Sequence, residues 1–261
     1  MPEGDTIHRS AARLREALVG KVVRSLRVQR IEGTRPHPGA TIEEVEAVGK
    51  HLLVHFDDGL TLQTHMMMSG SWHLYRPGER WQRPIHMARV VIEVDDRVAV
   101  CFLAPVVRSY RATARRSPID HLGVDLCRVD VDIDSAVRRI SSFASPDSEI
   151  APVLLDQRIA CGIGNVYKSE TLFACGVNPF TRLRELDETA LRSLFATAAR
   201  LLQANLEGGA RSTVVTGGLA VYGRVRRPCP SCGTPIERSS QGQPTRVTYW
   251  CPRCQPEIVR C

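Results

Sequence analysis

Two Cys-x-x-Cys pairs lie near the C-terminus, Cys229-Pro-Ser-Cys232 and Cys251-Pro-Arg-Cys254, with eighteen residues between them. Four cysteines at this spacing are typical of a zinc site closed by four thiolates. A closed site has no open coordination position, so we expect one structural Zn²⁺ and no catalytic metal. Residues 236–239 and 246–250 between the pairs have the pattern of strands. The spacing therefore predicts a zinc-bound β-hairpin.

Arginine carries nearly all the positive charge of the chain. The formal net charge is +7 and the isoelectric point about 9.1, while lysine occurs only as Lys21, Lys50 and Lys168. The arginine fork of donors suits phosphate geometry. Segment 221–261 holds seven arginines and two glutamates, a net charge of +5 in 41 residues. This balance indicates a polyanionic partner, and a basic zinc hairpin suits a nucleic-acid backbone.

Several classes of protein are excluded by the apolar pattern. No apolar run approaches the ~20 residues that a membrane span needs, and the N-terminus lacks the apolar region of a signal peptide. We therefore expect a cytoplasmic protein without a membrane partner, and a nucleic-acid partner would place it at the nucleoid. In that reducing compartment nine cysteines are thiols or metal ligands, not disulfides. Those outside the two pairs are expected to be core or incidental thiols: Cys101, Cys127, Cys161, Cys175 and Cys261.

The N-terminal residues permit an uncommon chemistry. Once Met1 is removed, Pro2 is a free secondary amine, which can attack an aldehyde carbon and form a charged iminium. Glu3 follows it directly and is placed to transfer protons. The alternative is that both are ordinary residues ahead of a helix, where proline and acids are common. These residues alone favour the ordinary interpretation, and the rest of the chain reverses that preference.

The first half of the chain reads as one helix followed by strands. Residues 5–19 have the apolar spacing of an amphipathic helix, with Asp5 or Thr6 as its cap. Residues 20–110 read mostly as short strands between turn signals, which favours a sandwich or barrel. The expected strands are 21–28, 51–56, 60–63, 90–94 and 98–103.

The pattern changes after residue 108. Residues 108–120 are polar and basic and read as a linker or hinge. Two short helices, 151–160 and 166–174, flank a glycine-containing turn in which Asn165 can cap the second helix. Such a turn with exposed N–H groups can bind phosphate, although an ordinary helix connection fits equally well. A longer helix follows over about 187–206.

Two stretches between the strands have both an ordinary and a functional interpretation. Lys50 precedes an apolar strand, either as a solvated hairpin lysine or as a phosphate or proton-transfer lysine. Met66, Met67 and Met68 cannot all face one side of a strand, so at least one should be exposed or in a loop. They are either core filler or an apolar wedge that enters a base stack, and alone they favour the core.

Together these segments resemble the formamidopyrimidine-DNA glycosylase and endonuclease VIII family. The segments that carry the resemblance are Pro2-Glu3-Gly4-Asp5-Thr6, Gly49-Lys50-His51, Asp156-Gln157 with Gly162-Ile-Gly-Asn-Val-Tyr-Lys-Ser-Glu170, Tyr222-Gly223-Arg224, and Arg246-Val-Thr-Tyr-Trp-Cys-Pro-Arg-Cys-Gln255. They occur in the family's order across nearly the whole chain. The opening segment is most similar to the actinobacterial endonuclease VIII branch.

The resemblance implies an α+β fold with DNA bound in a cleft. It implies an N-terminal β-sandwich catalytic domain flanked by an N-terminal helix over residues 1–115 and a linker or hinge over 116–130. A helix–two-turn–helix DNA-binding domain is then expected over 131–220, and a zinc-finger β-hairpin over 221–261.

The resemblance also implies a bifunctional DNA glycosylase and AP lyase of base excision repair. Pro2 would attack C1′ of an everted damaged nucleoside and displace its base, while Glu3 would protonate the sugar ring oxygen. The resulting iminium acidifies the neighbouring carbon, so the 3′-phosphate leaves by β-elimination and often the 5′-phosphate by δ-elimination. Flipping the base costs a few kcal/mol, least at damaged pairs.

The remaining roles implied by the resemblance concern binding. Lys50 and Arg246 are assigned to the catalytic residues as contacts to the phosphates around the lesion, and Asn165 binds phosphate beside them. Lys168, Met67 and Met68 complete the DNA-binding set, the methionines where family members insert apolar side chains. The zinc ligands are Cys229, Cys232, Cys251 and Cys254. The partner is damaged DNA, duplex or single-stranded, bound by a monomer.

The chain departs from the family's pattern in two places. Asp5-Thr6 stand where family members often have a second glutamate, which changes the local proton network. The Arg-Arg-Phe loop of the formamidopyrimidine branch is replaced by Phe102-Leu-Ala-Pro-Val-Val-Arg108. Oxidised pyrimidines are therefore favoured over oxidised purines as substrates.

Other functions remain open on the sequence alone. The chain could be a non-catalytic protein that binds DNA lesions, although Pro2, Glu3 and Lys50 together argue against it. It could also be an AP lyase with little glycosylase activity, which the missing second glutamate favours. A zinc-ribbon protein of the transcription or ribosomal kind would leave the first 220 residues unexplained.

Overall fold

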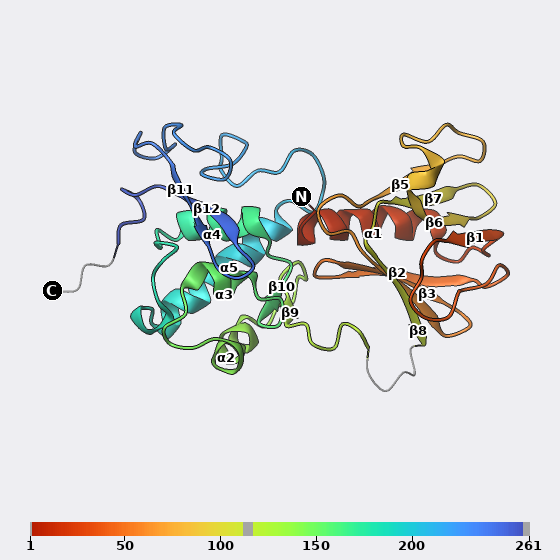
Figure 1. Cartoon of the computed structure of the whole chain (residues 1–261), viewed down its shortest axis with the longest axis horizontal. Helices are drawn as coiled ribbons and strands as arrows, with labels where there is room; N and C mark the ends of the chain where they lie inside the picture. The colour runs from red at the N-terminus through yellow and green to blue at the C-terminus, as the bar shows by residue number, and fades with distance from the viewer. Residues whose placement is uncertain (1, 112–116, 258–261) are drawn as a thin grey trace. The chain divides into compact units, whose positions relative to one another are not determined.

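The structure, a computed structural model, describes residues 2–111 and 117–257. Met1, Cys261 and the first residue of the expected linker lie outside the described residues. The chain divides into two units, Met1–Asp120 and His121–Cys261, whose helices and strands are labelled in Figure 1. Each unit has its own apolar core. The finer division into four parts, with boundaries near residues 115, 130 and 220, stays a prediction.

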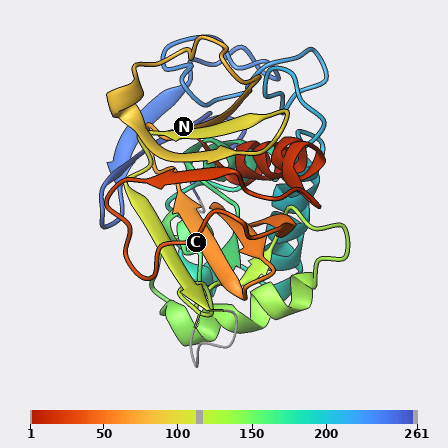
Figure 2. The ribbon, with the colours of Figure 1, turned by 90° about the vertical axis from the view of Figure 1, so that its right-hand side faces the viewer.

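The first unit is a sandwich of two four-stranded antiparallel sheets, whose strands Figure 2 draws in colours from red to yellow-green. One sheet has the order β1-β6-β7-β5, formed by Ser25–Val28, Ala88–Glu93, Val98–Phe102 and Ser71–Tyr75. The other has the order β2-β3-β4-β8, formed by Ile42–Val48, His51–Phe56, Leu60–His65 and Val106–Arg111. The short helix η1 (Ile85–Met87) precedes β6. Side chains from both sheets share one buried cluster, so the expected sandwich is confirmed.

Helix α1 (Gly4–Leu18) belongs to this sandwich core and packs against β2 and β3. Its apolar face is buried to 0–1% exposure, as the spacing predicts: Ile7, Ala11, Leu14 and Leu18. The expected capping was wrong, because the helix begins at Gly4 and the N-cap residue is Glu3 rather than Asp5 or Thr6. The carbonyl of Glu3 accepts the first helical N–H groups, from Thr6 at 3.0 Å and Ile7 at 3.1 Å.

Three strands of the first unit escaped the sequence pattern, namely β2, β5 and β8. Strand β2 has three glutamates and is buried only at Ile42 and Val45, so its apolar alternation is weak. Strand β8 includes Arg108 and Arg111, which made residues 108–111 resemble a linker. That interpretation was wrong for these four residues, because they complete a sheet by pairing with β4.

The second unit is a set of helices with a β-hairpin. Its elements are β9 (Val124–Asp125), α2 (Ile133–Phe143), α3 (Ile150–Leu155), β10 (Ala160–Cys161), α4 (Asn165–Ala174), η2 (Leu183–Glu185), α5 (Glu188–Gln203), β11 (Glu237–Gln241) and β12 (Arg246–Trp250). The two short strands β9 and β10 pair in parallel, and β11 pairs antiparallel with β12. Asp132 and Asp187 cap α2 and α5 through their side chains.

Two of the expected helices are shorter in the structure. Helix α3 ends at Leu155 rather than near residue 160, because Gln157 Nε2 donates to the carbonyls of Leu155 (2.8 Å) and Ile163 (3.0 Å) and closes a turn. Helix α5 ends at Gln203 rather than near residue 206. There Asn205 Nδ2 donates to Leu201 O (2.8 Å) and reaches the loop at Ser212 O (2.8 Å). Amide side chains that satisfy the last helical carbonyls end both helices.

The thiols outside the two Cys-x-x-Cys pairs are mostly in the cores. Cys101, Cys127 and Cys161 are buried and Cys175 is half-buried, which agrees with core or incidental thiols. Among the described residues no helix has both the length and the apolar character that crossing a membrane needs.

Candidate functional site

The N-terminal end of α1 brings two carboxylates into the interior beside Pro2. Pro2 is half-buried, whereas Glu3 and Asp5 have 0% of their surface exposed. Thr6 Oγ1 donates to Asp5 Oδ1 at 3.2 Å, and an Arg9 nitrogen lies 3.7 Å from the same carboxylate. The positive end of the helix dipole stabilises anions at this position. The arrangement places a buried acid directly after a residue that solvent reaches.

Lys50 lies in the turn that joins β2 to β3. The turn needs a positive φ, and Gly49 supplies it with φ +56°. The first pair of the next ladder, His51 and His65, follows immediately, so the Lys50 side chain and the end of β4 belong to one end of this sheet. Lys50 is half-buried and therefore retains access to solvent.

His51 and His65 form a contact that the sequence analysis did not anticipate. Their rings meet edge to face with centroids 4.5 Å apart, and His51 Nδ1 shares a 2.7 Å hydrogen bond with Gln63 Nε2. Burial, with a smaller contribution from the charge of Lys50, lowers the pKa of His65 to about 4. His65 is therefore neutral at pH 7, and its Nδ1 accepts a 3.2 Å hydrogen bond from Met67 N–H.

The three methionines divide between core and solvent, which confirms that they cannot all be buried. Met66 is 2% exposed and belongs to the sandwich core, whereas Met67 is 50% and Met68 69% exposed. Met67 has φ +47°, which is uncommon for a side chain of this size. The turn closes through a 2.8 Å hydrogen bond from Gly70 N–H to Met66 O. A Cβ at Gly70 would lie 2.8 Å from Met66 Cα, so the turn requires glycine.

In the second unit, Asn165 begins α4 but does not cap it. The N-cap residue is Gly164, and the expected capping role was wrong. Instead Asn165 Nδ2 donates to Val247 O of β12 at 2.7 Å, and its Oδ1 accepts from Lys168 Nζ at 2.7 Å. Asn165 thus joins the start of a helix to the hairpin.

Lys168 lies in the interior and not on the surface, with 1% of its area exposed. Its Nζ donates to Asn165 Oδ1, to Thr248 Oγ1 at 2.7 Å and to Val247 O at 3.3 Å. The DNA contact that the resemblance implied for Lys168 would need its ammonium to leave these acceptors.

A chain of buried amides and hydroxyls continues from Lys168 through the hairpin. Thr248 Oγ1 donates to Gln241 Oε1 at 3.0 Å, and Gln241 Nε2 donates to Glu149 Oε2 at 2.6 Å and to Pro179 O at 2.9 Å. Both Thr248 and Gln241 are buried. These bonds fasten the hairpin to the start of α3 as well as to α4.

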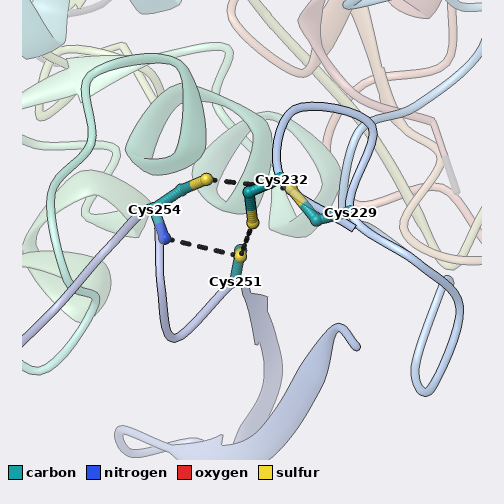
Figure 3. Close-up of side chains that lie close together, drawn as sticks. All are labelled: Cys229, Cys232, Cys251 and Cys254. Atoms are coloured by element: carbon teal, nitrogen blue, oxygen red, sulfur yellow. Dashed lines mark hydrogen bonds between the residues drawn. The ribbon is translucent and has the colours of Figure 1, made fainter. Parts of the chain in front are cut away.

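The four cysteines of the two Cys-x-x-Cys pairs converge (Figure 3). Cys229 Sγ lies 3.8 Å from Cys254 Sγ, and Cys232 Sγ lies 3.5 Å from Cys251 Sγ. Zn–S bonds of about 2.3 Å in a tetrahedron place neighbouring sulfurs roughly 3.8 Å apart, so the cluster fits this metal. Hydrogen bonds from Thr234 lower the pKa of Cys232 to about 6, which favours the thiolate that a metal needs.

Arg246 stands at the first position of β12 and is exposed. Its Nη1 donates a 3.2 Å hydrogen bond to the carbonyl of the preceding residue, Thr245. The next residue in the strand, Val247, is the one whose carbonyl accepts from both Asn165 and Lys168. Arg246 and Asn165 are therefore connected through one residue of backbone.

Each unit thus carries its own share of the site residues. The first holds Pro2, Glu3, Lys50, Met67 and Met68; the second holds Asn165, Lys168, Arg246 and the four cysteines. The sequence does not predict a part in these contacts for His65, Gln63, Gln241 or Thr248. They carry no spacing signal. Strand register sets the neighbours of His65 and Gln63, and the packing of the hairpin against α3 and α4 sets those of Gln241 and Thr248.

Family models match most of the chain. The model described as "Formamidopyrimidine-DNA glycosylase N-terminal domain" matches residues 1–106, and "Formamidopyrimidine-DNA glycosylase H2TH domain" matches residues 122–216. The second match spans the elements from β9 to α5, including α4 and the turn before it.

Curated relatives match over almost their whole length. The chain is 41% identical to the "Probable endonuclease 8 2" of Streptomyces coelicolor, covering 98% of this chain and 94% of the relative. It is 35% identical to the "DNA-(apurinic or apyrimidinic site) lyase Nei2" of Mycolicibacterium smegmatis, with 98% and 99% covered.

A solved structure of the MutM (Fpg) protein from Thermus thermophilus superposes with a TM-score of 0.81. It is 29% identical to this chain, and the match covers 98% of this chain and 99% of that one. The fold and the sequence matches agree over both units. This chain belongs to the formamidopyrimidine-DNA glycosylase and endonuclease VIII family, on the side of its actinobacterial endonuclease 8 relatives.

Proposed function

We propose that this protein is a DNA glycosylase and AP lyase of base excision repair that uses the amine of Pro2 as its nucleophile. The observation that carries the proposal is the pair at the start of α1. Solvent reaches Pro2, and the acid directly after it, Glu3, is fully buried. A proton donor held out of water beside an amine suits covalent catalysis at a sugar carbon.

The reaction follows from these two groups. The Pro2 nitrogen donates its lone pair to C1′, the glycosidic C–N bond breaks and the base leaves. The former N–H proton of Pro2 is lost and the departing base takes up a proton. Glu3 protonates the ring oxygen O4′, so the C1′–O4′ bond breaks, the sugar opens and an iminium forms between Pro2 and C1′. The iminium draws electrons from C2′, whose proton is lost, and the C3′–O bond breaks to release the 3′-phosphate. A second elimination, with loss of the C4′ proton, breaks the C5′–O bond and releases the 5′-phosphate. Water then hydrolyses the iminium and frees Pro2.

The binding residues supply phosphate contacts around the lesion. Lys50 in the β2–β3 turn and Arg246 at the start of β12 are cations that solvent reaches, and the Asn165 amide lies one backbone residue from Arg246. Met67 and Met68 fill the space of the flipped base. Zinc would be held by the four cysteines, and its chemistry there is structural, since thiolates would fill every coordination position. A monomeric state and a place in the nucleoid stay predictions.

We assign oxidised pyrimidines as the preferred lesions. The segment Phe102–Arg108 lacks the Arg-Arg-Phe loop of the formamidopyrimidine branch. Phe102 is buried, and Leu103 turns the chain with φ +54° directly after β7.

The decisive experiment is borohydride trapping on a duplex with one abasic site. Processed protein, with Met1 removed and intact mass verified, should form a covalent adduct that peptide mapping places on Pro2. Glu3→Gln should slow the reaction by about two orders of magnitude or more, as for loss of a general acid. Glu16→Gln is the matched control, because Glu16 is an exposed glutamate of the same helix.

The Pro2→Gly variant is not expected to abolish trapping, because glycine provides a primary amine that can still form an imine. The adduct is therefore expected to weaken and not to vanish, and a protein that keeps Met1 should trap nothing at residue 2. Intact DNA binding without any adduct in the processed protein would establish a non-catalytic lesion-binding protein instead.

An AP lyase with little glycosylase activity is the second candidate. Asp5 and Thr6 occupy the place where family members often have another glutamate, and the Asp5 carboxylate already accepts from Thr6. Duplexes with an oxidised pyrimidine distinguish the two functions. Cleavage of the abasic duplex without release of any oxidised base would favour the lyase alone.

A further inference from the structure

Lys168 carries a buried charge whose position contradicts a simple DNA-binding role. Its ammonium is almost fully enclosed, yet it lies against three oxygen acceptors from two parts of the chain about 80 residues apart. Burying a charge costs several kcal/mol unless hydrogen bonds compensate it. A methionine of similar length would fill the same volume without that cost. Packing alone therefore does not explain a lysine at this position.

The ammonium fixes which way the Asn165 amide faces. Lysine only donates hydrogen bonds, so the Asn165 atom 2.7 Å from Nζ must be the amide oxygen. The Val247 carbonyl only accepts, so the atom 2.7 Å from it must be the amide nitrogen. With both partners in place the amide cannot flip. One N–H of the Asn165 amide donates to Val247 O. The second N–H could donate to a phosphate oxygen of the DNA.

The same ammonium also holds strand β12. It donates to Val247 O and Thr248 Oγ1, the two residues that follow Arg246 (Figure 1 shows β12 beside α4). Thr248 passes the connection on through Gln241 to Glu149 and Pro179. One side chain thus joins the start of α4, the hairpin and, through them, the start of α3.

We propose that Lys168 is a positioning residue for DNA binding: it aims the Asn165 amide and fixes the strand that bears Arg246, without touching the DNA. The inference rests on the proposed function and deepens it, because it assigns to Lys168 a place behind the phosphate contacts. It replaces the direct DNA contact that the resemblance implied for this residue.

The test compares Lys168→Met with Asn165→Ala on abasic-site duplexes in which each phosphate near the lesion is replaced in turn by a methylphosphonate. This replacement removes the charge and acceptor strength of one phosphate. For the unaltered protein, a methylphosphonate at the phosphate that Asn165 contacts should lower the affinity about 10-fold, the usual value for a hydrogen bond to a charged group. Asn165→Ala should bind the unmodified duplex about 10-fold more weakly, and the methylphosphonate at that phosphate should no longer lower its affinity.

Lys168→Met is expected to reproduce the Asn165→Ala pattern. A methylphosphonate at the same phosphate should then have no effect on affinity; below, such a position is called silent. The variant should bind the unmodified duplex about 10-fold more weakly, and the double variant should bind no more weakly than either single one. A direct contact from Lys168 predicts otherwise. A different phosphate would then become silent, and the two losses would multiply. That result overturns the proposal, as does a Lys168→Met protein with unchanged affinity.

A second variant covers the case in which Lys168→Met does not fold. Thr248→Val removes an acceptor of the ammonium from the hairpin side and keeps the shape of the side chain. In this variant a methylphosphonate at the same phosphate should lower the affinity less than it does in the unaltered protein. A different position that became silent would contradict the proposal. Borohydride trapping of the unaltered protein runs in parallel. Trapping at Pro2 with an unchanged phosphate pattern in the variants would refute only the role of Lys168, whereas absence of trapping would refute the proposed function.

Discussion

The Oε1 atom of Glu170 on α4 accepts a 2.8 Å hydrogen bond from the backbone N–H of Tyr222, in the segment that leads to the cysteine cluster. The same oxygen accepts from Val221 N–H at 2.9 Å, and Oε2 accepts from Ala220 N–H at 2.7 Å and from the hydroxyl of Thr213. The carboxylate is 1% exposed. It thus takes four donors from a segment about 50 residues away and holds that segment on the helix.

Glu170→Gln is expected to destabilise the protein by about 3 kcal/mol. The amide replaces an accepting oxygen with an NH₂ group that faces backbone donors, and it weakens the remaining bonds by removing the charge. Urea unfolding measures the loss. Glu188→Gln is the control, since Glu188 is an exposed residue of α5 whose ion pair with Arg192 is worth less than about 1 kcal/mol. Equal effects of the two changes would contradict a holding role for Glu170.

These polar connections mark the limit of what the sequence could predict. The cysteine spacing and the apolar stripe of α1 are local patterns, and each predicted its structure. The bonds from Glu170 to Tyr222 and from Lys168 to Thr248 cross 52 and 80 residues, and a single side chain leaves no periodic signal. Strand β2 was missed for a related reason, because its glutamates hide the alternation of Ile42 and Val45.

Acid is expected to destabilise the first unit through His65. Its folded pKa of about 4 lies below the ordinary 6.5, so the unfolded chain binds the proton more tightly. The stabilisation is complete above pH 6.5 and is lost as the pH falls from 6.5 toward 4, in total about 3 kcal/mol. His65→Gln should flatten the pH dependence of unfolding over this range. His86→Gln is a matched control, because His86 is exposed; a slope unchanged by His65→Gln would refute this origin.

Chelation of zinc, or Cys251→Ser, is expected to unfold the finger and abolish DNA binding. A structural zinc supplies much of the folding free energy of a small hairpin module, and Arg246 lies in that hairpin. Zinc content, the near-ultraviolet signal of Trp250 and affinity for an abasic duplex should fall together. Cys175→Ser is the control, since Cys175 lies outside the cysteine cluster. Full affinity in zinc-free protein would mean that Arg246 has no part in binding.

Met68→Ala is expected to weaken binding to a lesion in duplex DNA without changing stability. The side chain is 69% exposed, so its removal leaves no cavity, but a wedge at a flipped base would lose its contacts. An abasic site in a single strand offers no stack to fill, so its binding should not change. Met66→Ala should do the reverse and cost about 2–5 kcal/mol of stability, because Met66 is buried in the core. Equal losses of Met68→Ala on both substrates would rule out a wedge.

Arg246→Ala is expected to lower the salt dependence of DNA binding. Each phosphate that a cation neutralises contributes about 0.9 to the slope of log K against log salt on duplex DNA, so the slope should fall by about that amount. Arg253→Ala provides the comparison within the same finger, because Arg253 is exposed but lies in the second Cys-x-x-Cys pair and not on β12. Titrations at four salt concentrations separate the two variants. A slope that falls equally for both would show that the finger binds DNA through diffuse charge, whereas a loss confined to Arg246→Ala identifies a fixed phosphate contact at the start of β12.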